Sequence, residues 1–143
     1  MKFIATFAAT VLLSFNLAAC AAAEGAIADR ETWLADAVAQ IESGDMTDLE
    51  DTIKATLGDT MHEDVEDLMA PLTNVMGDHK PLYVDKIVHE EMGTSFDQHI
   101  YAAYYGHREF LFYSFTFARL EDGWQLYSLD FADSLAGLNP ITN

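Results

Sequence analysis

The sequence predicts an α+β fold in which N-terminal helices pack on a curved four-stranded antiparallel β-meander. Residues 29–76 carry apolar side chains at spacings of three and four, the period of an amphipathic helix. Residues 82–131 are instead rich in aromatic and β-branched side chains, which favour strands. Short glycine-containing segments join the strand-like runs, and such connections link antiparallel neighbours. The chain of 143 residues is long enough for one domain with its own core.

Capping residues delimit the first two helices. The first helix is expected to begin at Asp29 and to stop at Gly44, because glycine readily ends a helix. Thr47 and Glu50 form a capping-box pattern, in which hydroxyl and carboxylate each accept a hydrogen bond from a free backbone N–H. This pattern predicts a second helix that ends at Gly58.

A third helix is expected after Thr60, which forms a second capping box with Glu63. Its apolar stripe continues to Met76 although Pro71 interrupts it. Proline lacks a backbone N–H and clashes with the preceding helical turn. We therefore expect a kink or a break near Ala70.

Four strands are predicted in the second half of the chain, with turns at the glycines between them. Their expected ranges are Leu82–Glu90, Asp97–Tyr105, Glu109–Arg119 and Trp124–Phe131. The folded domain is thus expected to cover residues 29–133. Residues 134–143 are expected to form a loose C-terminal tail with one helical turn.

The faces of the sheet depend on how the strands are paired. If Tyr105 pairs with Phe110 and Ala118 with Leu126, one face is too apolar for water and is expected to lie under the helices. That face would carry Leu111, Tyr113, Phe115, Phe117, Tyr127, Leu129 and Phe131. The opposite face would be mixed, and could be solvated, form a dimer interface or line a ligand pocket.

The mixed face carries the best candidate for catalysis, which consists of His99, Tyr101 and Asp130. A carboxylate can orient a histidine for proton transfer near neutral pH, and a phenol can donate to a developing oxyanion. The competing interpretation is an ordinary solvated sheet surface, which we favour. We accordingly expect His99 to be exposed and to titrate as a free histidine.

Two paired final strands, Phe110–Phe117 and Gly123–Leu129, follow the helices, and this order resembles the NTF2-like or cystatin-like superfamily. The resemblance covers residues 29–133 and implies a curved sheet wrapped around a helix to form a cone. Some members of the superfamily are isomerases or dehydratases that use an Asp or a His–Asp pair inside the cone. No catalytic motif of the family maps onto this sequence, so the resemblance concerns the fold more than an activity.

Neither a metal nor a cofactor is expected from the sequence. Five histidines occur, and none has the spacing of a zinc motif; His89 lacks the second histidine of H-E-x-x-H, and His62 with Glu66 fits a solvated helical pair. The 24 acidic and 7 basic residues give a formal net charge of −17. Such an acidic chain is not expected to bind nucleic acid, which requires clustered Lys and Arg.

The N-terminus predicts export and lipid attachment. Residues 1–19 have a basic start, a short apolar stretch and small residues at the end, which are typical of a signal peptide. Residues 17–20, Leu-Ala-Ala-Cys, resemble the bacterial lipobox, which implies acylation of Cys20, the single cysteine. Residues 20–28 would then tether the domain to the membrane. Cleavage after Ala23 is the alternative, and it would release a soluble periplasmic protein.

These observations favour an exported, lipid-anchored domain of the cell envelope that binds a ligand or accompanies another protein. The expected location is the periplasm, at the outer membrane, because the residue after Cys20 is Ala21 and not aspartate. A small apolar ligand, an envelope protein or a second copy of the chain could be the partner. The alternative is a small NTF2-like isomerase or hydrolyase that uses a His–Asp pair.

Overall fold

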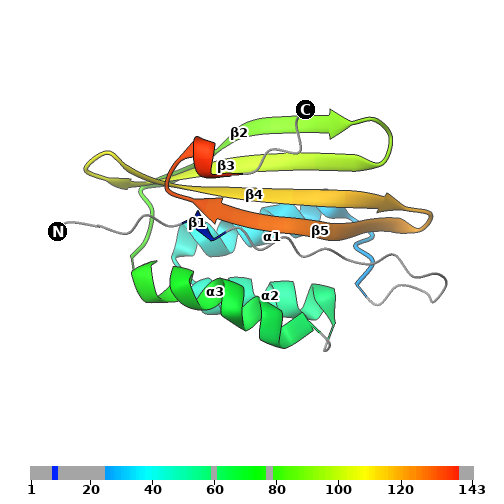
Figure 1. Cartoon of the computed structure of the whole chain (residues 1–143), viewed down its shortest axis with the longest axis horizontal. Helices are drawn as coiled ribbons and strands as arrows, with labels where there is room; N and C mark the ends of the chain where they lie inside the picture. Colours follow the sequence, from blue (N-terminus) through cyan, green and yellow to red (C-terminus); the bar gives the residue numbers. More distant parts are fainter. Residues whose placement is uncertain (1–7, 10–24, 59–60, 77–78, 139–143) are drawn as a thin grey trace.

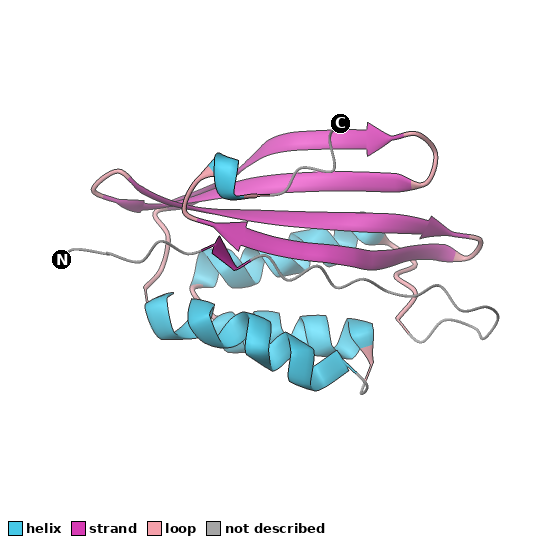
Figure 2. Cartoon of the chain, in the orientation of Figure 1, coloured by secondary structure: helices cyan, strands magenta, loops and turns pink. Residues whose placement is uncertain are grey.

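Three helices cover one face of an antiparallel sheet in the computed structural model, which describes residues 8–9, 25–58, 61–76 and 79–138 (Figure 1, Figure 2). The α+β class is therefore confirmed. The elements are β1 (Ala8–Ala9), α1 (Arg30–Ser43), α2 (Met46–Leu57), α3 (His62–Met76), β2 (Tyr83–Met92), β3 (Phe96–Gly106), β4 (Glu109–Leu120), β5 (Gly123–Ala132) and the 3-10 helix η2 (Leu135–Gly137). The sheet order is β1-β5-β4-β3-β2, so β2 to β5 form the predicted meander and β1 pairs with β5.

The ends of α1 are those predicted, whereas α2 is capped by a different residue. The Asp29 side chain accepts a hydrogen bond from the Thr32 N–H, and Gly44 closes α1 in the left-handed conformation. At α2 the cap is Asp45, which accepts from the Asp48 N–H at 3.0 Å. The predicted Thr47 capping box is therefore wrong, because a carboxylate two residues earlier already satisfies a free donor.

Helix α3 runs unbroken through Pro71 to Met76, so of the kink or break expected near Ala70 the break is wrong. Loss of one backbone hydrogen bond is outweighed here by tertiary burial of one face of the helix, which usually supplies most of a helix's stability. Leu68, Met69, Leu72 and Met76 on that face are all buried. Thr60, the predicted cap of α3, lies outside the described residues.

The core lies between the helices and one face of the sheet. Trp33 of α1 meets Phe115 and Phe117 of β4 edge-on, with ring centroids 5.8 and 5.6 Å apart. Aromatic pairs in this geometry contribute beyond the area that they bury. The face predicted to be covered is therefore covered at its centre, and Tyr113, Phe115 and Phe117 are 0% exposed.

The predicted register of β3 is wrong by one residue. Tyr104, not Tyr105, pairs with Phe110, and an irregularity separates this pair from Gly106–Glu109. Side chains alternate along a strand, so a one-residue shift moves every side chain of β3 to the other face. Position 99 consequently lies directly opposite Phe115 and under the helices.

The register of β5 is also shifted, by a β-bulge opposite Thr116 and Phe117. Leu126 pairs with Phe117 instead of Ala118 and lies in the core. Tyr127, predicted in the core, contacts Phe96 at 5.2 Å and is not part of the core. An extra residue in one strand explains why strict alternation misplaced these two side chains.

Two contacts attach the ends of the domain to the sheet. Ile27 pairs with Trp124 just before α1, and a side chain at Gly123 would approach the Ile27 carbonyl oxygen to 2.6 Å. After β5, Leu138 is 2% exposed and packs with Ile100 on the face away from the core helices. The tail thus contains the expected helical turn and is anchored up to residue 138. None of the helices among the described residues has the length and apolar character needed to cross a bilayer.

Candidate functional sites

A buried carboxylate, Asp97 of β3, lies at the centre of a polar cluster inside the core. Asp97 is 1% exposed. Its Oδ1 is 2.8 Å from His89 Nε2 and its Oδ2 is 2.9 Å from His99 Nε2. The Arg30 guanidinium also forms an ion pair with Oδ2. Two imidazoles and one guanidinium therefore converge on a single carboxylate.

The local structure explains why these four side chains meet. Asp97 and His99 are two residues apart on β3 and so share a face. His89 of the edge strand β2 pairs directly with His99, and their rings stack with centroids 4.4 Å apart. Arg30 is the first residue of α1, and its guanidinium lies 4.3 Å from the centre of the Trp124 ring. The start of α1 thus brings a cation over the polar end of the core.

Burial favours the neutral form of His99. Its side chain is 0% exposed, and this burial lowers the pKa of His99 although the hydrogen bond to Asp97 opposes the shift. A carboxylate only accepts hydrogen bonds, so Nε2 carries the hydrogen and donates it to Asp97. The other ring nitrogen, Nδ1, is buried without a hydrogen-bond partner among the described residues.

The structure separates the catalytic candidates predicted from the sequence. His99 and Tyr101 lie on the helix-covered face, where burial raises the pKa of Tyr101 to about 12. Asp130 pairs with Ser114 on the opposite face, so the predicted His99–Asp130 pair does not form. The expected exposure of His99 is also wrong. The true partner, Asp97, was missed, although the Asp-x-His spacing on a strand was a readable signal.

The centre of the opposite face carries polar side chains that are buried, in contrast to the solvated surface that we expected. Gln98, Ser114, Thr116, Ser128 and Asp130 are each at most 5% exposed. Asp130 accepts a hydrogen bond from the Ser128 hydroxyl at 3.0 Å, and burial raises its pKa against the effect of that bond. The last sequence candidate, Cys20, lies outside the described residues.

A pocket of about 770 Å³ opens at one end of the molecule, between the second half of α3 and the β3–β4 hairpin. Its apolar wall consists of Pro71, Leu72, Val75, Met76, Tyr105, Leu111 and Phe131. Its remaining lining comprises His79, Lys80, His107, Arg108, Glu109, Phe110 and Asp133. Pockets of this size with mostly apolar walls and a few polar groups are typical of small-molecule sites.

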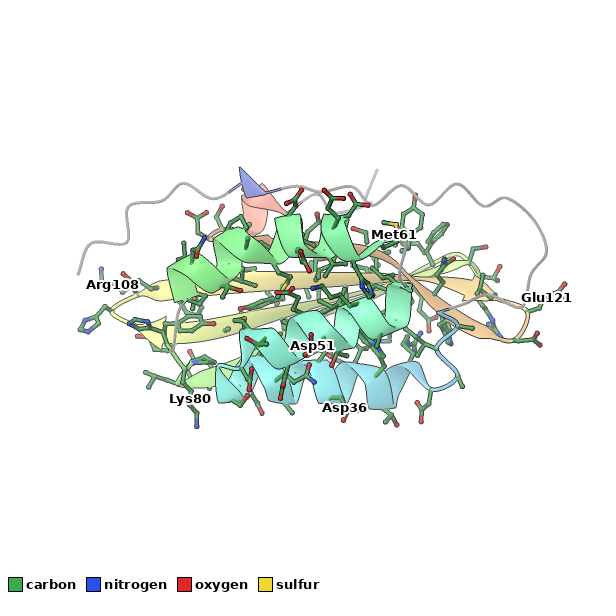
Figure 3. The ribbon with its side chains drawn as sticks, turned by 90° about the horizontal axis from the view of Figure 1, so that it is seen from below. Asp36, Asp51, Met61, Lys80, Arg108 and Glu121 are labelled. Carbon is green, nitrogen blue, oxygen red and sulfur yellow. The ribbon has the colours of Figure 1, made fainter. Side chains whose placement is uncertain are left out.

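Two cations are placed at this pocket without a carboxylate partner. Lys80 and Arg108 project at the same end of the molecule, far from Glu121 (Figure 3). Neither forms a salt bridge with another described residue, whereas Arg30 and Lys54 are both paired. Glu109 and Asp133 also line the pocket, but neither forms a salt bridge with Lys80 or Arg108.

The turn that presents Arg108 is conformationally strained. His107 and Arg108 both have positive φ, 53° and 67°. Residues other than glycine adopt this region at a cost of about 1–2 kcal/mol each, and two-residue hairpins normally place Asn-Gly there. Such outliers concentrate at binding sites, where the surrounding structure maintains them. The strained turn therefore lies at the same end of the molecule as the pocket, and both of its residues line the pocket.

The fold and the pocket define this chain as a small α+β domain with a cavity at one end of a meander. Comparison with known protein families and with characterised proteins finds no match. Among solved structures, the chain is similar to a cystatin-like protein from Ruminococcus gnavus, with 17% identity and a TM-score of 0.43. The match covers 75% of this chain and spans only 38% of the other protein's length. A likeness this distant supports no functional argument.

Proposed function

We propose that this chain is an exported, lipid-anchored domain of the cell envelope that binds a small apolar ligand carrying an acidic group. The observation that carries the proposal is the pocket of about 770 Å³ with its apolar wall and the unpaired cations Lys80 and Arg108. An apolar body would replace water along the wall, and an acidic group would meet the two cations. The proposed location is supported by the signal-like pattern of residues 1–20.

Binding is better supported than the alternative of an isomerase or hydrolyase. That alternative relied on His99 and Asp130 acting on one wall, and the strand pairing puts them on opposite faces of the sheet. Neither residue lines the pocket. The pocket instead offers the two properties that ligand binding requires, which are apolar area and a few polar groups that fix orientation.

Dodecanoate should bind the full chain with one site in isothermal titration calorimetry, and dodecanol should bind more weakly. The double variant Lys80→Gln/Arg108→Gln should weaken dodecanoate binding by about three- to tenfold, the effect of removing two partly solvated charge contacts. Binding of dodecanol should be unchanged in the same variant. Val75→Phe, which narrows the apolar wall, should weaken the binding of both compounds.

The matched control is Arg119→Gln, which removes a cation from the opposite end of β4, near Trp124. We expect dodecanoate affinity in this variant to equal that of the unmodified chain. If dodecanoate does not saturate a site, or if Arg119→Gln weakens it as much as the pocket variant does, the proposed ligand site is wrong.

Lipid attachment is tested separately through Cys20. The mature protein should partition with membranes and carry lipid mass on its first residue, because several acyl chains on one cysteine anchor a protein stably. Cys20→Ser should release or misprocess the protein in a cell-fractionation experiment. An intact soluble product that starts at Glu24 would instead support cleavage after Ala23 and contradict the lipid anchor.

A further inference from the structure

We infer that His89, Asp97 and His99 form a binding site for a late first-row divalent metal ion, with Zn²⁺ as the best fit. The three residues offer two imidazole nitrogens and one carboxylate oxygen, and these atoms lie within 4.8 Å of one another. This donor set suits zinc, which takes nitrogen and oxygen ligands in tetrahedral sites. The inference is independent of the pocket, which contains none of the three residues.

The spacing of the ligand atoms is close to what an ion needs. Both Nε2 atoms already point at the carboxylate, at 2.8 and 2.9 Å. With metal–ligand distances of about 2.0–2.2 Å, neighbouring ligands around a tetrahedral ion are about 3.3–3.6 Å apart. The hydrogen bonds would be replaced by bonds from the two Nε2 atoms to the metal, and an imidazole bound in this way carries its hydrogen on Nδ1.

The exposed member of the cluster allows the ion to enter. The side chain of His89 is 42% exposed on the edge strand, whereas those of Asp97 and His99 are 1% and 0% exposed. The two imidazoles are stacked within 14° of parallel, and an ion must lie close to the plane of each ring that binds it. Because His99 is fully buried, His89 is the ring that must turn to bind the ion. Water can then take the fourth coordination position, on the exposed side of the site.

Arg30 is suited to an outer position at such a site. Its guanidinium contacts Asp97 Oδ2, the oxygen that also accepts from His99, so Oδ1 beside His89 would be the oxygen that binds the ion. Carboxylates that bind metals are commonly hydrogen-bonded through their other oxygen, and this orients them. His99 lacks the equivalent support, because its Nδ1 has no partner among the described residues. Missing outer partners cost about 10–100-fold in affinity, so we expect micromolar binding.

Zn²⁺ titrated into chelator-treated full-length protein should bind with a stoichiometry of one and a dissociation constant of about 1–10 μM. This affinity is lower than that of structural zinc sites, because the outer partner of His99 is missing. His89→Ala should bind at least about tenfold more weakly, because it removes one of three ligands. Co²⁺ should give visible absorption bands in the unmodified chain, and His89→Ala should lose them. Circular dichroism should show that the variant stays folded, since His89 is on an exposed edge.

The matched control is His62→Ala, which removes a histidine on α3 outside the cluster. It should leave the affinity for Zn²⁺ and the Co²⁺ spectrum unchanged. Absence of saturable binding overturns the inference. Equal binding by the unmodified chain and by folded His89→Ala also overturns it, because the acidic surface would then account for the ion.

Discussion

Replacing Phe115 with alanine should lower the free energy of unfolding by about 3–5 kcal/mol, which is enough to unfold a marginally stable domain. Phe115 is 0% exposed and lies at the centre of the sheet, where β3 and β5 flank it through His99 and Leu129. Its ring packs against Trp33 and Tyr101. The cost combines lost transfer free energy with a cavity, because these rings belong to separate elements and cannot close together.

Urea unfolding followed by circular dichroism measures this loss. Phe110→Ala is the matched control, because Phe110 lies on the same strand but is 38% exposed. We expect it to cost less than about 1 kcal/mol, in line with substitutions away from the core. Similar losses in the two variants would show that the helix-covered face is not the main core.

Replacing Asp97 with alanine should cost about 3–5 kcal/mol, because removing one member of a buried ion pair leaves the other charge without compensation. Asp97 is the single acceptor shared by Arg30, His89 and His99. The Arg30 side chain is only 15% exposed, and without Asp97 its one remaining ion-pair partner among the described residues is the exposed Glu31. The fully buried side chain of His99 would also lose the one hydrogen bond that it makes to a described residue.

The same denaturation experiment applies, with Glu31→Ala as the control. Glu31 also accepts a hydrogen bond from Arg30, but its side chain is 61% exposed. Exposed ion pairs contribute about 0–1 kcal/mol, so this variant should be nearly as stable as the unmodified chain. Equal effects of Asp97→Ala and Glu31→Ala would mean that the buried carboxylate does not organise the cluster.

Element types and boundaries could be predicted from the sequence because they follow from local periodicity. The four long strands lie within two residues of their predicted ranges, and α1 has the predicted cap and stop. Register could not be predicted in the same way. An irregularity near Gly106 and a bulge opposite Thr116 each displace a strand by one residue. Since side chains alternate, the shift near Gly106 put all of β3 on the wrong face, whereas the bulge misplaced Leu126 and Tyr127 of β5.

The candidate sites could not be predicted from the sequence because they depend on register and on tertiary packing. The sequence indicates His99 as a candidate residue. Because the predicted register places it on the wrong face of the sheet, the expected partner is Asp130 instead of Asp97. Arg30 reaches Asp97 only through the packing of α1 on the sheet, which no local pattern specifies. The pocket likewise joins α3 to a hairpin distant in sequence. Sites that depend on tertiary packing were thus beyond a pattern-based prediction.

The order of the sheet has a consequence for how quickly the chain can fold. From β2 to β5, each strand pairs with its immediate neighbour in sequence, so hairpins can close short loops one after another. Proteins dominated by such local pairings have low contact order and fold faster than sheets with distant pairings. The bridge between Ile27 and Trp124 is different, because it joins the segment before α1 to the last strand. Because closing this long loop costs entropy, we expect the bridge to form late, after the hairpins of the meander.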